Sequence, residues 1–381
     1  MLFDYTTIQL IWWGLVAILL IGFALTDGFD MGAGTLMPFI GQTDTERRVI
    51  TNVLGPHWDG NQVWFILAGG ALFAAWPMVY AAAFSGLYIP LLLVLFALIV
   101  RPGAFEYRSK VDDTRWRSSW DWLLFVGSFV PALLFGVAMG NLFLGLPFYL
   151  DSDLRPFYEG GFFELLHPFA LLAGLTSVAL LAMHGGTYLQ MRTEESALRR
   201  RAVGASRLMA VVMMAAFGAA GAWLALGMEG FRIASMPEVV DTIQPLDKTV
   251  VAEEGAWLAN YAKAPWTLLA PVAGFAGALG VLLLSGIGRG VLAFGASTVA
   301  VLGVLLTAGV SLFPFIMPSS IDPTSSLTVF DATSSHRTLS VMLIATLIFM
   351  PIILLYTSWA FRAMRGPVTE AQVEENSHSM Y

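Results

Sequence analysis

The chain has 381 residues, of which 57% are hydrophobic and only 12% are charged. Soluble domains carry roughly a quarter charged residues, so this composition excludes an ordinary water-soluble protein and indicates that lipid surrounds most of the chain. The formal net charge of -7 therefore says little about binding partners. The absence of cysteine excludes disulfides, thiolate metal sites, iron–sulfur clusters and covalently attached c-type haem.

The apolar stretches predict the membrane topology. A transmembrane helix needs about 20 predominantly apolar residues. The first apolar run lacks the basic start and the cleavage site of a signal peptide, so we expect it to be retained as a span. The predicted spans are 8–38, 50–76, 79–101, 117–146, 161–191, 203–228, 264–287, 290–317 and 337–363. The sequence thus predicts an all-α integral membrane protein, a single polytopic domain (1–381) with a bundle of about nine transmembrane helices.

The positions of Lys and Arg predict the orientation, because these residues concentrate in cytoplasmic segments. With the N-terminus in the periplasm, 15 of the 20 Lys and Arg residues fall in cytoplasmic segments and 5 in outer ones. Removing any one span would reverse every later loop and spoil this segregation. We therefore expect a periplasmic N-terminus, a cytoplasmic C-terminus with a short tail at 366–381, and longer periplasmic loops at 229–263 and 318–336. Neither loop resembles a folded domain.

The strongest polar cluster lies inside the second predicted span, in the run GPHWDGNQ at 55–62. A charged side chain in the bilayer costs roughly 2.5–3.5 kcal/mol, so each is a candidate functional residue. Pro56 removes a backbone donor, which favours a kink and bound water. Asp59 and Gln62 share a helix face, and Asp59 lies about 12–14 Å along the helix from its inner end. With His57 they form either a candidate functional site or a polar cluster whose only role is to hold helices together.

Asp27 and Asp30 lie three residues apart near the inner end of the first span. Two interpretations are open. They are functional acids inside the protein, or they are solvated acids at a helix end that leaves the bilayer.

Three charged residues, Arg101, Glu106 and Lys110, follow the third span. Glu106 and Lys110 have the spacing of a surface ion pair on a helix. Together with Asp59 they could also form a series of ionisable groups, called the ladder below, that conducts protons from cytoplasmic water into the protein. Both interpretations remain open at this point.

Histidine supplies the remaining candidate haem ligands. His167 opens the fifth span and His184 closes it. Neither has a His or Met at a spacing that would indicate a second haem ligand, so a hydrogen-bonded polar histidine is the simpler interpretation of each.

Several blocks of the chain together resemble subunit II of the cytochrome bd ubiquinol oxidases, the quinol-oxidising terminal oxidases of bacteria. The similarity covers essentially the whole chain. The matching stretches are IWWGLVAILLIGFALTDGFDMG at 10–32, DTERRVITNVLGPHWDGNQVW at 44–64, GGALFAAWPMVYAAAFSG at 69–86, RPGAFEYRSK at 101–110, YLQMRT at 188–193, TAGVSLFPFIMPSS at 307–320, SLTVFDATSS at 326–335 and PIILLYTSW at 351–359.

The resemblance implies a heterodimer in the bacterial inner membrane with a haem-bearing subunit I. Such a complex oxidises ubiquinol and reduces oxygen to water in aerobic respiration, and it generates proton motive force without pumping. The b-type and d-type haems are expected on subunit I, with no catalytic residue and no metal ligand in this chain. Subunit II would complete the membrane core. The family pattern also accommodates a quinone held as a structural lipid and a small single-span accessory subunit.

Position by position, the resemblance implies a cytoplasmic proton path at Asp59, Glu106, Lys110 and Tyr381. Glu106 stands where the family pattern has Asp, so the acid is kept but its reach is longer by one methylene.

The resemblance also implies a role in oxygen access for Trp64, with Arg101 in a conducting region nearby. Asp27, Asp30 and His57 match polar positions of the core.

Two other functional classes fit the residues alone. A polytopic secondary transporter or channel would use the polar second span as its substrate site and act without a coloured cofactor. A structural membrane scaffold would use the buried acids only to hold helices together. Co-purification of b- and d-type haem with a second large subunit would distinguish the oxidase from both.

Overall fold

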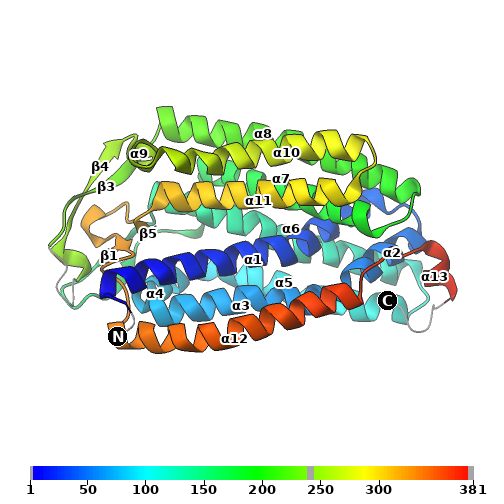
Figure 1. The fold of residues 1–381 in the computed structure, drawn as a ribbon, viewed down its shortest axis with the longest axis horizontal. Helices are drawn as coiled ribbons and strands as arrows, with labels where there is room; N and C mark the ends of the chain where they lie inside the picture. The colour runs from blue at the N-terminus through cyan, green and yellow to red at the C-terminus, as the bar shows by residue number, and fades with distance from the viewer. Residues whose placement is uncertain (1–2, 238–243, 376–381) are drawn as a thin grey trace.

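A computed structural model describes residues 3–237 and 244–375, and it consists mainly of long helices that run side by side (Figure 1). In these two ranges, eight helices are long and apolar enough to cross a membrane. They are α1 (Tyr5–Ile40), α5 (Tyr88–Tyr107), α6 (Thr114–Leu144), α7 (Pro168–Arg192), α8 (Ala197–Leu226), α10 (Leu269–Gly286), α11 (Gly290–Leu312) and α12 (His336–Ala363). The predicted all-α membrane bundle is confirmed.

The second predicted span is divided into two helices. α2 (Asp44–Leu54) ends just before Gly55 and Pro56, and α3 (Trp58–Ala75) begins after His57. The break that Pro56 predicts is therefore present. α3 has 18 residues, about 27 Å of helix, and lies against α1 and α12 in the bundle (Figure 1). It is not among the eight long apolar helices, so the count of nine spans stays a prediction.

Glycines allow two central helices to cross in close contact. A Cβ atom built on Gly32 of α1 would lie 1.8 Å from the carbonyl oxygen of Leu181 in α7. A Cβ atom on Gly185 of α7 would lie 2.2 Å from the backbone nitrogen of Ala33. Small residues are the usual means by which membrane helices approach one another. Here they bring the polar inner third of α1 against α7.

Short elements close the two ends of the bundle. Beyond the long helices, the described chain contains α4 (Pro77–Gly86), α9 (Ala259–Lys263), α13 (Glu370–Glu375) and the 3-10 turns η1 (Arg108–Lys110), η2 (Phe162–Leu166), η3 (Pro245–Asp247), η4 (Ala256–Leu258), η5 (Pro265–Leu268) and η6 (Pro323–Ser325). Three antiparallel hairpins pair β1 (Phe148–Leu150) with β2 (Pro156–Tyr158), β3 (Glu229–Ser235) with β4 (Thr249–Glu254), and β5 (Phe315–Met317) with β6 (Leu327–Thr328).

The described parts of the two loops expected in the periplasm contain regular structure, which their composition did not predict. The segment 229–263 contains the β3–β4 hairpin and 318–336 contains β6, which pairs with β5 just before it, and both lie at one end of the bundle (Figure 1). Lys248 and Asp331 join them through an ion pair of 2.9 Å whose side chains are both 0% exposed. Burial lowers the pKa of Lys248, while the attraction of Asp331 acts in the opposite direction. The two loops are thus joined into one structure at this end of the bundle.

The tail after α12 returns to the opposite end of the bundle. The amide of Val368 donates to the carbonyl of Arg192 at 2.8 Å, and Val373 of α13 is fully buried. Residues 376–381 of the predicted tail, including Tyr381, lie outside the described residues.

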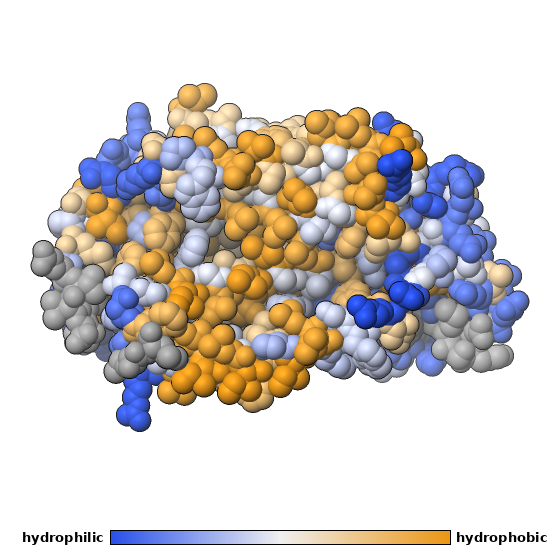
Figure 2. All heavy atoms as spheres, in the orientation of Figure 1, coloured by the Kyte–Doolittle hydropathy of each residue, from blue (hydrophilic) through white to orange (hydrophobic). Residues whose placement is uncertain are grey.

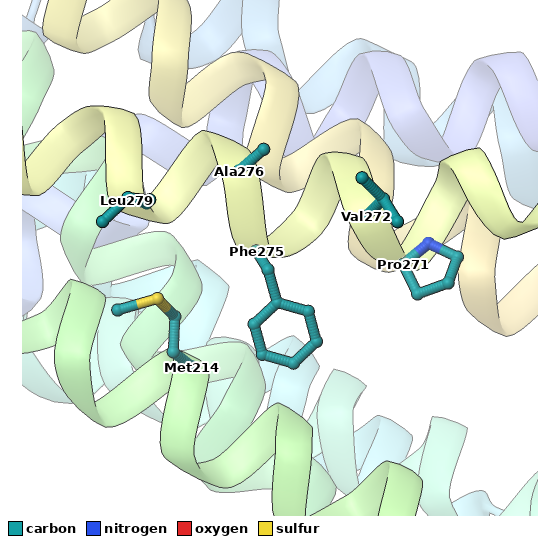
Figure 3. Close-up of a pocket in the computed structure, with 6 residues that line it drawn as sticks. All are labelled: Met214, Pro271, Val272, Phe275, Ala276 and Leu279. Atoms are coloured by element: carbon teal, nitrogen blue, oxygen red, sulfur yellow. The ribbon is translucent and has the colours of Figure 1, made fainter.

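The surface has the pattern of a protein surrounded by lipid. Figure 2 shows hydrophobic residues along the middle of the visible face and hydrophilic residues at both ends. On this kind of surface α8 and α10 leave a groove lined by Met214, Pro271, Val272, Phe275, Ala276 and Leu279 (Figure 3). The lining is apolar throughout, as expected for a surface that contacts acyl chains.

Candidate functional site

The polar residues of the first and third predicted spans meet inside the bundle. Arg101 of α5 donates two hydrogen bonds to Asp27 of α1, at 2.9 and 2.8 Å. Both side chains are almost completely inaccessible. Asp27 is thus a functional or structural acid within the core, and its interpretation as a solvated helix end is wrong. The two terminal nitrogens of Arg101 are thus paired within this chain, while its Nε is buried without a hydrogen bond.

Asp30 forms the second half of this cluster. One of its carboxylate oxygens accepts a hydrogen bond from Asn61 of α3 at 2.7 Å, and the other is buried without a partner. Asn61 comes from the GPHWDGNQ run, so the first turn of α3 contributes to the core. An acid with one free oxygen next to a charged pair is suited to hold a proton. Asn61 is one of the two amides of the predicted polar cluster, but its partner Asp30 was not predicted.

Asp59, Glu106 and Lys110 all lie on the outside of the isolated chain. The position of Asp59 departs from the expectation of a partly desolvated acid within the bundle. Asp59 and Gly60 point outward because Asn61 and Trp64 take the inward face of α3. The ladder therefore follows the surface of this chain.

Aromatic stacking joins the start of α3 to the end of α5. Trp58 and Phe105 stack with ring centroids 5.4 Å apart and an interplanar angle of 13°. These residues directly precede Asp59 and Glu106, so the start of α3 and the end of α5 are fixed side by side. Lys110 lies one turn farther, at the end of η1. The residues that precede Asp59 and Glu106 are thus in contact, and the proton ladder itself stays a prediction.

Trp64 lies between α3 and α1. Its ring is almost fully buried, and a Cβ atom built on Gly22 would approach it to 2.6 Å. Leu19 and Phe23 belong to the same apolar cluster. The surroundings are apolar, which is compatible with passage of a small nonpolar molecule.

The histidines of the described chain are engaged by their neighbours. His184 contacts Ser297 through Nδ1 at 2.7 Å and the carbonyl of Leu25 through Nε2 at 3.1 Å, so both ring nitrogens are occupied. His167 accepts from the Phe169 amide at 3.2 Å. His57 stacks on Phe361 at 4.3 Å, and its Nε2 is buried without a hydrogen bond.

These contacts leave no axial pair for a haem in the described ranges, and no group of three or more metal-binding side chains occurs there. Placement of the haem ligands on the partner remains a prediction.

An ionic network that sequence reasoning missed fixes the inner end of the bundle. Asp121 of α6 accepts from Arg47 at 2.7 Å and from Arg108, while Asp44 pairs with Arg108 and Arg117 at 2.9 Å. The partners lie up to 74 residues apart in the sequence. The network holds α2, η1 and α6 together beneath the ladder.

Glu46 performs a similar task at the start of α2. It accepts hydrogen bonds from the amides of Gln42 and Thr43 and from Arg201 of α8. Burial acts to raise the pKa of Glu46, but these hydrogen bonds outweigh it and lower the pKa below its ordinary range. The role of Glu46 could have been predicted from the sequence, because Thr43-x-x-Glu46 has the capping-box pattern.

Comparison with known proteins agrees with this geometry. The family model for cytochrome bd terminal oxidase subunit II matches residues 8–364. The chain is 50% identical over 379 residues to the cytochrome bd-I ubiquinol oxidase subunit 2 of Escherichia coli K12, covering 99% of this chain and 100% of the relative. It is 32% identical to the cytochrome bd ubiquinol oxidase subunit 2 of Bacillus subtilis, covering 95% and 97%.

The fold agrees with a solved structure as well. A chain of the bd oxidase from Geobacillus thermodenitrificans superposes with a TM-score of 0.68, covering 94% of this chain and 99% of that chain at 12% identity. At that identity the likeness concerns the fold alone. The full-length sequence match confirms the resemblance inferred from the conserved-looking blocks. The chain belongs to the cytochrome bd terminal oxidase subunit II family.

Proposed function

We propose that this chain is the subunit of a ubiquinol oxidase that carries protons from the cytoplasm toward the site of oxygen reduction. In the complex, subunit I holds the b-type and d-type haems, oxidises ubiquinol and reduces oxygen to water. The haems supply the electron transfer and oxygen chemistry. This chain supplies ionisable groups, an apolar path beside Trp64 and the membrane core.

One observation carries the proposal: Asp59 is exposed on the isolated chain although its helix belongs to the bundle. A carboxylate that faced lipid at this depth would cost roughly 2.5–3.5 kcal/mol. The cost disappears if a partner subunit covers the residue and lines a hydrated path with it. The outward placement of Asp59, which a lone transporter would not need, therefore supports a path at the interface with subunit I.

The surface around Asp59 supports the same location of the interface. α12 is largely exposed on the isolated chain, and the exposed residues of α5 are large and apolar, including Leu95, Phe96 and Ile99. We propose that subunit I packs against α3, α5 and α12. Lys110 and Glu106 would then lie at the cytoplasmic end of the interface with subunit I, and Asp59 would lie deeper within this interface. Tyr381 is assigned to the same end of the interface by family resemblance alone.

Asp30 offers a second position for a proton. It has a free oxygen, accepts a hydrogen bond from Asn61 in the first turn of α3, and lies near the Asp27–Arg101 pair. We propose that α3 links the two positions, because Asp59 faces outward and Asn61 faces Asp30.

Substitution of Asp59 tests the proposed proton path. Asp59→Asn preserves shape and removes the titrating group, so oxygen reduction by the two-subunit complex should fall more than about tenfold, a barrier increase above roughly 1.4 kcal/mol. The apparent KM for ubiquinol and the haem content should change little. Oxygen consumption, the quinol dependence and the haem spectrum of the purified complex measure these quantities.

Matched variants separate proton transfer from structure. Asp59→Glu should restore most of the turnover, and Glu106→Gln should act more weakly than Asp59→Asn because solvent bypasses a group near water more easily. Glu195→Gln, an exposed acid in the loop before α8, should leave turnover unchanged. Near-normal turnover of a fully assembled Asp59→Asn complex would show that Asp59 is structural.

A further inference from the structure

A pocket with two arginines lies at the Arg-rich end of the bundle. Its walls are the end of α7, the start of α8, the turn between α10 and α11, and the tail at Pro367. Arg199 and Arg289 line it, together with one acid, Glu194. The site is separate from the ladder, which lies on α3 and α5.

The arginines are available to a ligand. Arg199 donates to the carbonyl of Gly288 at 3.2 Å, and Arg289 is exposed. Within residues 3–237 and 244–375, no carboxylate forms an ion pair with either. Arg207, also exposed, lies against Gly286 at the end of α10. Two guanidinium groups therefore line the pocket against the single carboxylate of Glu194, and a third, that of Arg207, lies beside the same turn.

The backbone adds to the positive potential. α11 is 23 residues long, begins at Gly290 beside the pocket, and no side chain in the described chain caps its first turn. The start of a long helix favours anions because its first amides lack intrahelical acceptors. Gly290 is required here, since a Cβ atom would lie 2.8 Å from the carbonyl of Gln190.

Apolar residues border the charged ones on the side toward the membrane. Val291 and Leu292 line the pocket and are 66% and 50% exposed, and Ile287 beside them is 65% exposed. A free inorganic phosphate would use only the arginines. A molecule with an anionic head and hydrocarbon chains would use both parts of the pocket.

We propose that this pocket binds the phosphodiester headgroup of an anionic glycerophospholipid, with its acyl chains along Val291 and Leu292. The excess of arginine over carboxylate favours an anionic lipid over a zwitterionic one. The bound lipid would join the α7–α8 loop to the α10–α11 turn.

Native mass spectrometry of the complete oxidase complex tests the proposal. The complex is reconstituted with phosphatidylglycerol or with phosphatidylethanolamine, then transferred to detergent, and the lipids retained are counted. Arg199→Gln/Arg289→Gln should retain phosphatidylglycerol about tenfold less than the wild type. Arg115→Gln, which removes an exposed arginine elsewhere on the same end of the bundle, should retain as much as the wild type.

A single variant and a competition with inorganic phosphate complete the test. Arg289→Gln alone removes no hydrogen bond that shapes the fold, and should lower retention even if the double variant fails to assemble. An excess of inorganic phosphate should not displace the lipid, because phosphate lacks the apolar contacts. Equal retention by the variants and Arg115→Gln, equal retention of the two lipids, or full displacement by phosphate would each overturn the proposal.

Discussion

At the residue scale, the polar side chains of this protein follow the cost of charge in lipid. Asp27 and Arg101 are completely buried and pair with each other through two hydrogen bonds. A bidentate arginine–carboxylate pair satisfies both charges at once. The pair allows two charged residues to remain in the core, beside the free oxygen of Asp30.

Breaking this pair is expected to destabilise the protein strongly. Arg101→Gln leaves Asp27 buried without its cation, and loss of one member of a buried pair costs about 3–5 kcal/mol. Thermal unfolding of the purified complex and its yield from membranes measure the effect. Arg155→Gln is the matched control, because Arg155 is 67% exposed and exposed pairs contribute about 1 kcal/mol or less. Similar losses for the two variants would contradict this account.

His184 gives a second prediction at this scale. Both ring nitrogens are occupied by Ser297 and Leu25, so His184→Ala should leave all haem bands of the assembled complex in place. Its effect should appear instead as lower thermal stability, because Ser297 and the Leu25 carbonyl lose a buried partner. The visible spectrum and the unfolding temperature distinguish the two roles. Loss of one haem from an assembled complex would make His184 a ligand.

Sequence reasoning found the individual charged residues but not their partners. Asp27, Asp30, Asp59 and Arg101 were predicted as candidates because charge in an apolar span is costly. The pairing of Asp27 with Arg101 spans 74 residues, and nothing in local spacing encodes it. The outward direction of Asp59 also escaped prediction, since hydropathy does not tell which face of a helix meets a partner.

At the scale of elements, close helix crossings depend on individual glycines. Gly32→Ala would place a methyl group 1.8 Å from the Leu181 carbonyl, which is backbone and cannot move aside cheaply. The variant should reduce the amount of folded complex severely. Gly14→Ala on the same helix meets nothing within 4 Å, so it should be neutral or slightly stabilising. Yield and unfolding temperature compare them, and equal behaviour would refute the crossing.

The start of α2 should make part of the stability depend on pH. The pKa of Glu46 is lower in the folded protein than in the unfolded chain. Its contribution is therefore complete above the ordinary glutamate pKa, about 4.3, and disappears as the pH falls through the folded pKa. Glu46→Gln should be less stable than the wild type at neutral pH, and the difference should shrink in acid. A difference that is independent of pH would contradict this assignment.

Element boundaries were predictable where chemistry marks them. Pro56 predicted the break between α2 and α3, and the apolar runs predicted the long helices. The hairpins of the outer loops were not predicted, because their strands are short and their contacts are distant. The Lys248–Asp331 pair, which joins the two loops, connects residues that lie 83 positions apart.

At the scale of the whole molecule, the chain has a clear division between its two sets of polar groups. Asp27 and Arg101 pair within the chain and Asp30 accepts a hydrogen bond from Asn61, whereas Asp59 and Glu106 are presented on the surface. The first set explains how the bundle tolerates charge by itself. We propose that the second set faces subunit I, which would pack against α3, α5 and α12. We expect the dependence on subunit I to rest on the exposed groups of α3 and α5.

The number and direction of the spans can be tested directly because the chain has no cysteine. Single cysteines at Phe3, Asp112 and Glu374, all exposed, report on the N-terminus, the segment after α5 and the tail. If α3 crosses the membrane, α1, α3 and α5 separate Phe3 from Asp112. Phe3→Cys should then react with a membrane-impermeant maleimide in intact spheroplasts, whereas Asp112→Cys and Glu374→Cys should react only after permeabilisation.

This pattern is expected because 15 of the 20 Lys and Arg residues lie in the segments assigned to the cytoplasm. Figure 1 shows the same alternation, since α1 and α12 both begin at the end of the bundle that holds the hairpins, and α13 lies at the other end. Wild-type protein, which cannot react, is the control for background labelling. If Phe3→Cys and Asp112→Cys reacted on the same side, α3 would not cross the membrane. Asp59 would then lie at the membrane surface, and a path leading inward from it would lose its physical basis.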